Sequence, residues 1–179
     1  QTAGVNTLSA EFDLDAEGRY TRLAVRQGAH PDWPQLRRHR IGIGLYNEVE
    51  GRLVRTRYVE TDVEGELTDI AELAGETQPD LLLLNDADLT YAKIRLDERS
   101  LATAISGLSR LDDSLARALV WGAAWDMTRD AEMAATDYVE LVLANIGSET
   151  DPWGVSRIPS TAATAASAYS APAGRAVLL

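Results

Sequence analysis

The two histidines are the first residues to test for chemistry, because imidazole binds metals and transfers protons near neutral pH. His30 and His39 are the only histidines, and both lie in or beside a predicted loop. Zinc needs three or four convergent ligands, and neither histidine belongs to an HExxH or HxxE pattern. The chain also has no cysteine. We therefore expect no metal site, no bound cofactor and no thiolate nucleophile in this chain.

Serines and paired carboxylates form no catalytic constellation either. A serine nucleophile needs a base and an orienting group, and the chain has no GxSxG elbow. Ser100 fits the first turn of a helix. The pairs Asp86/Asp88 and Asp112/Asp113 suit turns and helix caps, where Asp accepts bonds from nearby amides. NDADLT resembles a calcium loop but lacks its glycine and distal glutamate. We predict no catalytic, cofactor-binding or metal-binding residues.

Several arginines fall on adjacent predicted strands and could form a basic patch. Carboxylates such as Glu48, Glu50 and Glu60 on the same sheet are the expected partners, because opposite charges pair across strands. The arginines are Arg37, Arg38, Arg40, Arg52, Arg55 and Arg57. The net charge of −11 also argues against nucleic acid, which requires clustered unpaired cations.

Gly42 and Gly44 share one face of a predicted strand. They could allow a ligand to approach the backbone, but a large side chain from the opposite strand or a neighbouring domain is the favoured cover. The GIG sequence is not a dinucleotide fingerprint, because the third glycine, the following helix and the acidic residue are missing.

No stretch approaches the roughly 20 apolar residues that span a bilayer, and the N-terminal residues lack a signal-peptide pattern. We therefore expect a soluble protein. The absence of cysteine fits a reducing compartment, so the predicted location is the cytoplasm.

The first half of the chain reads as short strands separated by polar turns. Alternation predicts Phe12 and Leu14 inward in the first strand, and Ile94 and Leu96 inward in the last. The predicted strands are 11–15, 20–27, 39–48, 52–63, 67–73, 81–84 and 91–96, with a loop over 28–38. This spacing favours a β-sandwich over residues 1–96.

From Asp97, a candidate N-cap, the apolar period changes to that of helices. One stripe comprises Leu115, Ala118, Leu119, Gly122, Trp125 and Met127, after a cap at Asp112 or Asp113. A helix over 137–146 would end at Gly147 in the C′ position. Asp151-Pro152 begins another, which either starts late or kinks at Pro159. The predicted fold is mixed, a β-sandwich followed over 97–179 by the first helices of an α-helical, solenoid-like domain.

Three stretches resemble a known family. They are TAGVNTL at 2–8, DLLLLNDADLTYAKIRLD at 80–97 and WGAAWDMTRDAEMAATDYVELVLANI at 121–146, the last chiefly through Trp121, Trp125, Asp126, Arg129, Asp130, Met133 and Tyr138. Together they resemble the region that follows the peptidase domain of bacterial aminopeptidase N, a zinc-dependent gluzincin family.

The resemblance implies a noncatalytic scaffold of an enzyme that removes N-terminal residues from peptides. The family's GxMEN and HExxH motifs are absent here, so no catalytic residue carries over. Zinc is expected in the parent's catalytic domain, and this chain alone should be inactive. The alternative is an independent β-sandwich binding or adhesion module with a helical appendage. A small stand-alone hydrolase would need a catalytic group that the sequence lacks.

The chain starts at Gln1 and ends in RAVLL, and we expect an excised piece of a longer protein. Its expected partners are the parent's catalytic domain and remaining C-terminal helices, with peptide substrate bound only by the full enzyme. Apolar side chains without partners would then remain, namely Trp121, Trp125, Tyr138, Leu141 and Ile146. We expect the piece to self-associate or to fold residues 161–179 over them.

Overall fold

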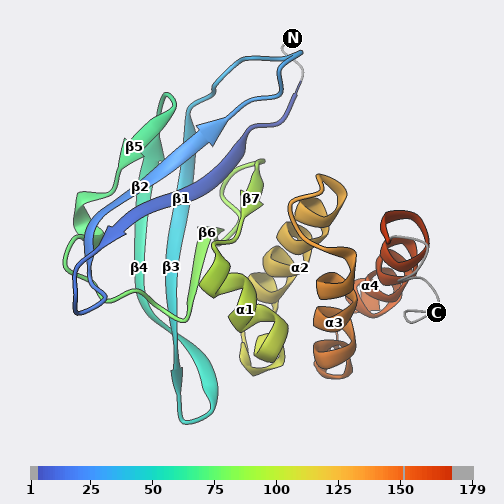
Figure 1. Ribbon diagram of the computed structural model, residues 1–179. Helices are drawn as coiled ribbons and strands as arrows, with labels where there is room; N and C mark the ends of the chain where they lie inside the picture. The colour runs from blue at the N-terminus through green and yellow to red at the C-terminus, as the bar shows by residue number, and fades with distance from the viewer. Residues whose placement is uncertain (1–3, 151, 171–179) are drawn as a thin grey trace. The chain divides into compact units, whose positions relative to one another are not determined.

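The chain forms two units, each described here by itself. The structure is a computed structural model that describes residues 4–150 and 152–170 (Figure 1). Unit 1 comprises Gln1–Asn47 and Arg55–Ser100, and unit 2 comprises Glu48–Val54 and Leu101–Leu179. The strand β7 ends at Arg95 and the helix α1 begins at Glu98. The predicted domain boundary at 96/97 stays a prediction.

Two sheets build unit 1. A four-stranded sheet has the order β5-β2-β1-β7, and a three-stranded sheet has the order β4-β3-β6. The pairs are antiparallel for β1 with β2, β2 with β5 and β3 with β6, and parallel for β1 with β7. The strands are β1 Thr7–Leu14, β2 Tyr20–Gly28, β3 His39–Val49, β4 Arg52–Val63, β5 Leu67–Asp69, β6 Leu81–Asp86 and β7 Lys93–Arg95.

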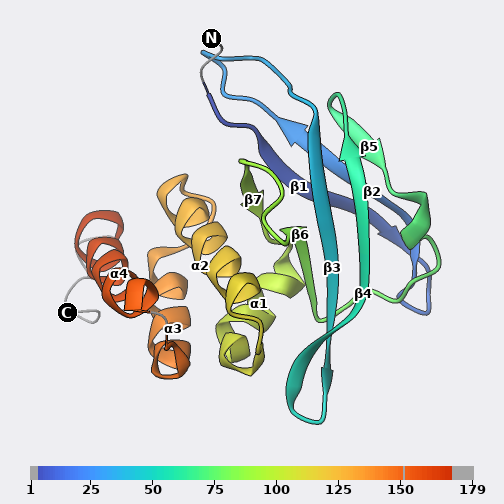
Figure 2. The same ribbon diagram turned by 180° about the vertical axis from the view of Figure 1, so that it is seen from behind.

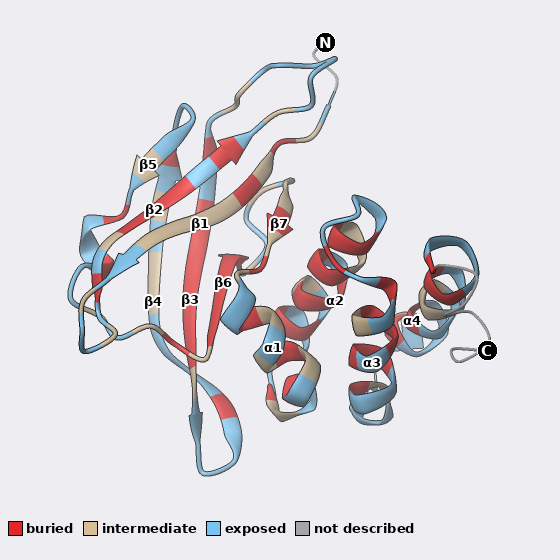
Figure 3. Cartoon of the chain, viewed as in Figure 1, coloured by how far each residue is buried: buried red, intermediate tan, exposed pale blue. Residues whose placement is uncertain are grey.

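The core of unit 1 comes from alternating apolar residues of both sheets. Ile41 and Ile43 of β3 are fully buried, as is Val25 of β2. All six residues of β6 are buried, which explains its continuous apolar run LLLL. Figure 3 shows this buried band along β3 and β6. The predicted β-sandwich is confirmed, and Ile94 and Leu96 lie in its core, each 6% exposed.

Two strand predictions differ from the structure. The first strand starts at Thr7 and buries Leu8 completely, whereas Leu14 is 39% exposed and not inward as predicted. A register irregularity between Asp13 and Leu14 explains this, because it breaks the alternation at the end of the strand. The predicted strand 67–73 covers only Leu67–Asp69 and continues as a 3₁₀ turn, η1, over Ala71–Leu73.

Gly42 and Gly44 are covered by side chains from neighbouring strands, as the sequence predicted. A methyl group at Gly42 would overlap Tyr58 of β4, and one at Gly44 would overlap the carboxylate of Asp86 on β6. Asp86 is 1% exposed, and its Oδ2 accepts bonds from Tyr46 Oη at 2.9 Å and an Arg55 guanidinium at 3.0 Å. The glycines therefore make room for a buried, fully bonded carboxylate.

In the described residues, four α-helices and short 3₁₀ or π turns follow the strands, and the reverse view is in Figure 2. Asp97 caps α1 through the amides of Arg99 and Ser100, as predicted. Asp113, rather than Asp112, caps α2. The elements are α1 Glu98–Gly107, η2 Leu108–Arg110, α2 Ser114–Arg129, α3 Ala135–Asn145, η3 Ile146–Ser148, α4 Pro152–Thr164 and η4 Ala165–Tyr169. The predicted order, β then α, is confirmed.

Helix ends were predicted less well than helices. Gly147 lies inside the 3₁₀ turn η3 and is not a left-handed C′ residue, so that prediction is wrong. The turn tightens the end of α3 and satisfies its carbonyls without a left-handed residue. α4 begins at Pro152 and runs through Pro159, so it does not start late. Asp151 and residues 171–179, which belong to the predicted cap and tail, lie outside the described residues.

In the described part of the chain, no helix is long and apolar enough to cross a membrane.

Replacing Gly44 by alanine should destabilise unit 1 by about 1 to 3 kcal/mol, because the new methyl group would displace the Asp86 carboxylate from its bonds. Urea unfolding followed by circular dichroism measures this. Gly122→Ala on α2 is the matched control, since nothing lies within 4 Å of the added carbon. It should stabilise its helix by up to about 1 kcal/mol. An equal change in the free energy of unfolding for the two variants would contradict the inference that Gly44 leaves room for the Asp86 carboxylate.

Candidate functional site

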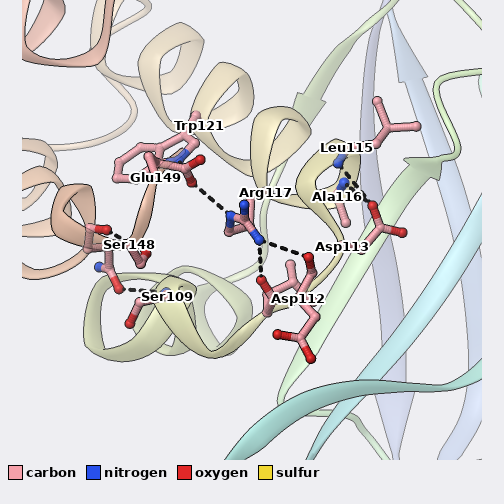
Figure 4. Close-up of polar contacts among 11 residues, drawn as sticks. Ser109, Asp112, Asp113, Leu115, Ala116, Arg117, Trp121, Ser148 and Glu149 are labelled. Carbon is pink, nitrogen blue, oxygen red and sulfur yellow. Dashed lines mark hydrogen bonds and ion pairs between the residues drawn. The ribbon is translucent and has the colours of Figure 1, made fainter. Parts of the chain in front are cut away.

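A buried ion pair lies between helix α2 and the turn that follows α3 (Figure 4). Arg117 Nε is 2.8 Å from Glu149 Oε1, and the two side chains are only 10% and 5% exposed. Trp121 Nε1 donates to the same carboxylate oxygen at 3.0 Å. Arg117 Nη1 donates to the carbonyls of Leu111 at 2.7 Å and Asp112 at 2.9 Å. The guanidinium and the carboxylate thus have partners beyond each other.

The local helix geometry explains how these groups meet. Arg117 and Trp121 are four residues apart on α2, so they lie on one face of the helix. Asp113 fixes the start of α2 by accepting bonds from the amides of Leu115 and Ala116. Glu149 follows the 3₁₀ turn that closes α3, and the amide of Glu149 donates to Ile146. The ion pair therefore joins α2 to the segment after α3, and the bonds from Arg117 to the Leu111 and Asp112 carbonyls add the segment before α2.

Asn145, at the end of α3, makes a second connection of the same kind. This side chain is 2% exposed and its Nδ2 donates to the carbonyls of Ala104 and Ile105. Its Oδ1 accepts from the amide of Ser109 at 2.9 Å. The end of α1 and the end of α3 are therefore held together by a single amide side chain.

The tip of the β3–β4 hairpin, Glu48–Val54, belongs to the same unit. Leu53, 3% exposed, forms a parallel bridge with Leu111. Arg52 pairs with Asp112, and Arg110 pairs with Glu48. The carbonyls that Arg117 binds are therefore in the segment that receives the hairpin tip.

A groove runs beside the ion pair. One part, about 320 Å³, is lined by Leu115, Trp121, Glu149 and Ile158 among others. A second part, about 110 Å³, shares Trp121 and Ile158 and adds Trp125, Tyr138, Arg157 and Thr161. Trp125 stacks obliquely on Tyr138 with ring centroids 5.4 Å apart. The groove has an aromatic wall and one buried carboxylate.

Four members of the apolar stripe predicted for α2, Leu115, Ala118, Gly122 and Trp125, line this groove, whereas its last member, Met127, is buried in the core. Leu115 is 44% exposed, whereas the buried face of α2 carries Ala116, Val120, Ala123, Ala124 and Met127. Both faces of α2 are apolar, so periodicity alone selected the wrong one. The sequence had suggested that Tyr138 and Leu141 would lack partners. In the structure both are buried, at 1% and 0% exposed, so other residues of the chain already cover them.

The histidines are far from forming a metal site. His30 is exposed, with Nδ1 3.7 Å from the Asp32 carboxylate. His39 is buried, with Nδ1 2.7 Å from Thr90 Oγ1 and Nε2 3.1 Å from Asn6 Oδ1. Over residues 4–150 and 152–170, no three His, Asp or Glu side chains are placed to hold a metal ion. The absence of a metal site remains a prediction.

Ser100 and the acidic pairs have the structural roles expected for them. Ser100 Oγ donates to Asp97 Oδ2 and accepts from the amide of Leu82 at 2.8 Å. Asp88 Oδ1 accepts a long bond from Asn85, at the turn after β6. Ser100 thus links the first turn of α1 to strand β6, which is the structural role that its position indicated.

The arginines pair with carboxylates, as predicted, but mostly not with those named. Arg40 pairs with Glu60 at 3.2 Å, which the sequence anticipated. Further pairs are Arg38 with Asp62 and Glu64, Arg40 with Asp62, Arg52 with Asp112, Arg55 with Asp86 and Arg57 with Glu76. Most are exposed pairs that contribute little to stability.

Sequence reasoning missed the Arg117–Glu149 pair. The partners are separated by a helix, a turn and a second helix, so no local spacing links them. One signal was present, since Arg117 lies between Ala116 and Val120 on the buried face of α2. A cation at a core position of a helix implies a buried acidic partner.

Comparison with known proteins gives two matches. Residues 81–178 match the family described as ERAP1-like C-terminal domain. The chain is 48% identical over 187 aligned residues to Aminopeptidase N from Streptomyces lividans. That alignment includes all of this chain but only 22% of the relative's length. The matches confirm the resemblance predicted from the sequence.

Replacing Glu149 by alanine should lower the free energy of unfolding by about 3 to 5 kcal/mol, because Arg117 would stay buried without its counter-charge. Chemical denaturation measures this. Glu140→Ala, an exposed position on the neighbouring helix α3, is the control and should change stability by less than about 0.5 kcal/mol. The double variant Arg117→Met/Glu149→Leu should recover most of the loss. An unchanged midpoint for Glu149→Ala would contradict the structural role.

The free energy of unfolding should decrease as the pH is lowered below about 6.5, because burial, aided by nearby Arg37, lowers the pKa of His39. The unfolded chain then binds a proton that the folded chain resists, so stability is complete above the ordinary histidine pKa. It is lost as pH falls toward the lowered one, by at most about 1.4 kcal/mol per pH unit. Unfolding of His39→Gln should lack this slope, whereas the exposed-site variant His30→Gln should keep it. A slope shared by His39→Gln and the wild type would refute the assignment.

Proposed function

Because the chain belongs to the family of ERAP1-like C-terminal domains, we propose that it is the noncatalytic scaffold of a zinc-dependent aminopeptidase. Such an enzyme would remove N-terminal residues from peptides. The observation that carries the proposal is the 48% identity to Aminopeptidase N along the whole chain. An identity this high along the whole chain supports a shared role and not only a shared fold.

The catalytic groups would lie in other parts of the polypeptide. The chain spans 22% of the length of the relative, and its own sequence has no HExxH motif. Its residues do not fit a zinc site, because His39 is buried between Asn6 and Thr90 while His30 is exposed. Zinc and its ligands would therefore belong to the catalytic domain.

The scaffold would supply rigid surfaces to its neighbours. In unit 1 the buried Asp86 network fixes one face of the three-stranded sheet. In unit 2 the Arg117–Glu149 pair and Asn145 hold successive helix connections in place. The proposed neighbours are the catalytic domain and further C-terminal helices, and peptide substrate would contact the assembled enzyme. The proposed location remains the cytoplasm.

A segment exchange tests this function. The segment of the Streptomyces lividans enzyme that matches this chain is replaced by residues 1–179, and hydrolysis of aminoacyl anilides and zinc content are measured. The chimera should keep both properties, because the exchanged segment carries the fold and no catalytic ligand. The same enzyme with the segment deleted should lose activity.

The chain by itself gives the complementary measurement. It should hold no stoichiometric zinc after dialysis and should hydrolyse aminoacyl anilides no faster than a heat-treated control. Full activity of the deletion enzyme would show that the segment is no scaffold, and turnover by the isolated chain would show that it is not noncatalytic.

A further inference from the structure

The groove beside the Arg117–Glu149 pair has the size of a small-molecule site. Its larger part has a volume of about 320 Å³, and its walls include Leu115 and Trp121 of α2 and Ile158 of α4. Sites for small molecules commonly have volumes of roughly 300 to 1,000 Å³ and are lined mainly by apolar and aromatic side chains. A volume at the lower end of this range suits a molecule of one or two rings.

The walls of the groove favour a flat aromatic ligand. Trp121 borders both parts of the groove, and the smaller part adds Trp125 and Tyr138. The rings of Trp125 and Tyr138 have centroids 5.4 Å apart and an interplanar angle of 44°. Aromatic rings attract a further ring through offset or edge-to-face contacts. A ring in the larger part would therefore contact Trp121 on one side and the aliphatic Ile158 on the other.

The groove also contains one hydrogen-bond acceptor that the protein does not use. The Glu149 side chain lines the larger part, is 5% exposed and lies beside Trp121 (Figure 4). Over residues 4–150 and 152–170, the bonds from Arg117 Nε and Trp121 Nε1 both end on Glu149 Oε1, and none ends on Oε2. A buried carboxylate oxygen without a donor is costly, so a ligand that donates to Oε2 gains free energy there.

The charges around the groove determine what kind of donor fits. Arg117 already neutralises Glu149, so a cationic ligand would gain no net attraction and would lie close to the Arg117 guanidinium. Arg157, which lines the smaller part, is a second cation nearby. A ligand carboxylate would meet Glu149 as a like charge and has no hydrogen to donate. A neutral N–H or O–H group meets none of these penalties.

We propose that this groove binds a free, neutral aromatic molecule that carries one N–H or O–H donor, of the chemical class of indole and the phenols. Its ring lies against Trp121, and its donor binds Glu149 Oε2. The walls supply most of the affinity, and the carboxylate oxygen selects molecules that have a donor. The inference rests on the groove of unit 2 alone and not on the proposed aminopeptidase role.

Isothermal titration calorimetry of the whole chain with indole, up to the solubility limit of indole, tests the inference. The wild type should bind one indole per chain. N-methylindole, which has the same rings but no donor, should bind at least roughly tenfold more weakly, because Oε2 then stays without a partner. No binding of indole, or equal binding of the two compounds, overturns the inference.

N-acetyltryptophanamide separates a free molecule from a side chain of a polypeptide. It carries the indole ring on a peptide backbone that the groove has no room to enclose, so it should bind more weakly than indole. Tighter binding than indole would assign the groove to a tryptophan side chain of a polypeptide and would overturn the proposal of a free ligand.

A substitution at Ala118 locates the bound indole. Ala118 borders both parts of the groove and is exposed on α2, so Ala118→Phe should place a ring in the groove and weaken indole binding at least roughly tenfold. Ala144→Phe, at an exposed position of α3 that does not line the groove, is the matched control and should bind as the wild type does. Circular dichroism verifies that both variants are folded. Unchanged binding by folded Ala118→Phe overturns the assignment, and if that variant does not fold, the comparison of indole with N-methylindole on the wild type decides.

Discussion

The helical unit depends on one buried pair of opposite charges. Arg117 and Glu149 are both removed from water, and desolvation alone would make them unfavourable. Two backbone carbonyls and the Trp121 indole supply the remaining bonds, so the pair is stable only when three separate segments are in place. An ion pair of this kind specifies an arrangement more than it adds stability. It selects one packing of α2 against the connections around it.

Unit 1 also contains a buried charge, but accommodates it with small residues instead of long side chains. The Asp86 carboxylate is buried on the face of a sheet, and two glycines remove the side chains that would exclude it. Arg55 and Tyr46 then satisfy the same oxygen. In the sheet, two glycines leave room for the buried carboxylate. In the helical unit, the long side chains of Arg117 and Glu149 reach each other across the packed elements. In both units the buried charge is tied to backbone shape, which agrees with the proposed scaffold role.

Patterns of short range were predictable from the sequence, and contacts of long range were not. Alternation located β2, β3 and β4 to within a residue or two, because burial on one face imposes a period of two. The prediction that Leu14 points inward failed because a register irregularity interrupts that period. On α2 both faces are apolar, so the sequence could not tell the core from the groove. The partner of Arg117 could not be found either, because tertiary folding brings Glu149 to it.

The hairpin tip has a consequence for synthesis on the ribosome. Residues 48–54 belong to a unit whose other residues start at Leu101, and the Glu149 that completes the charge pair follows 95 residues after Val54. At typical elongation rates that interval is roughly 5 to 20 s. Leu111, which covers Leu53, is made 57 residues after Val54, so for the first part of that interval a nascent chain exposes an apolar hairpin tip to chaperones. The sandwich can close early, whereas the helical unit must wait for its own C-terminal connections.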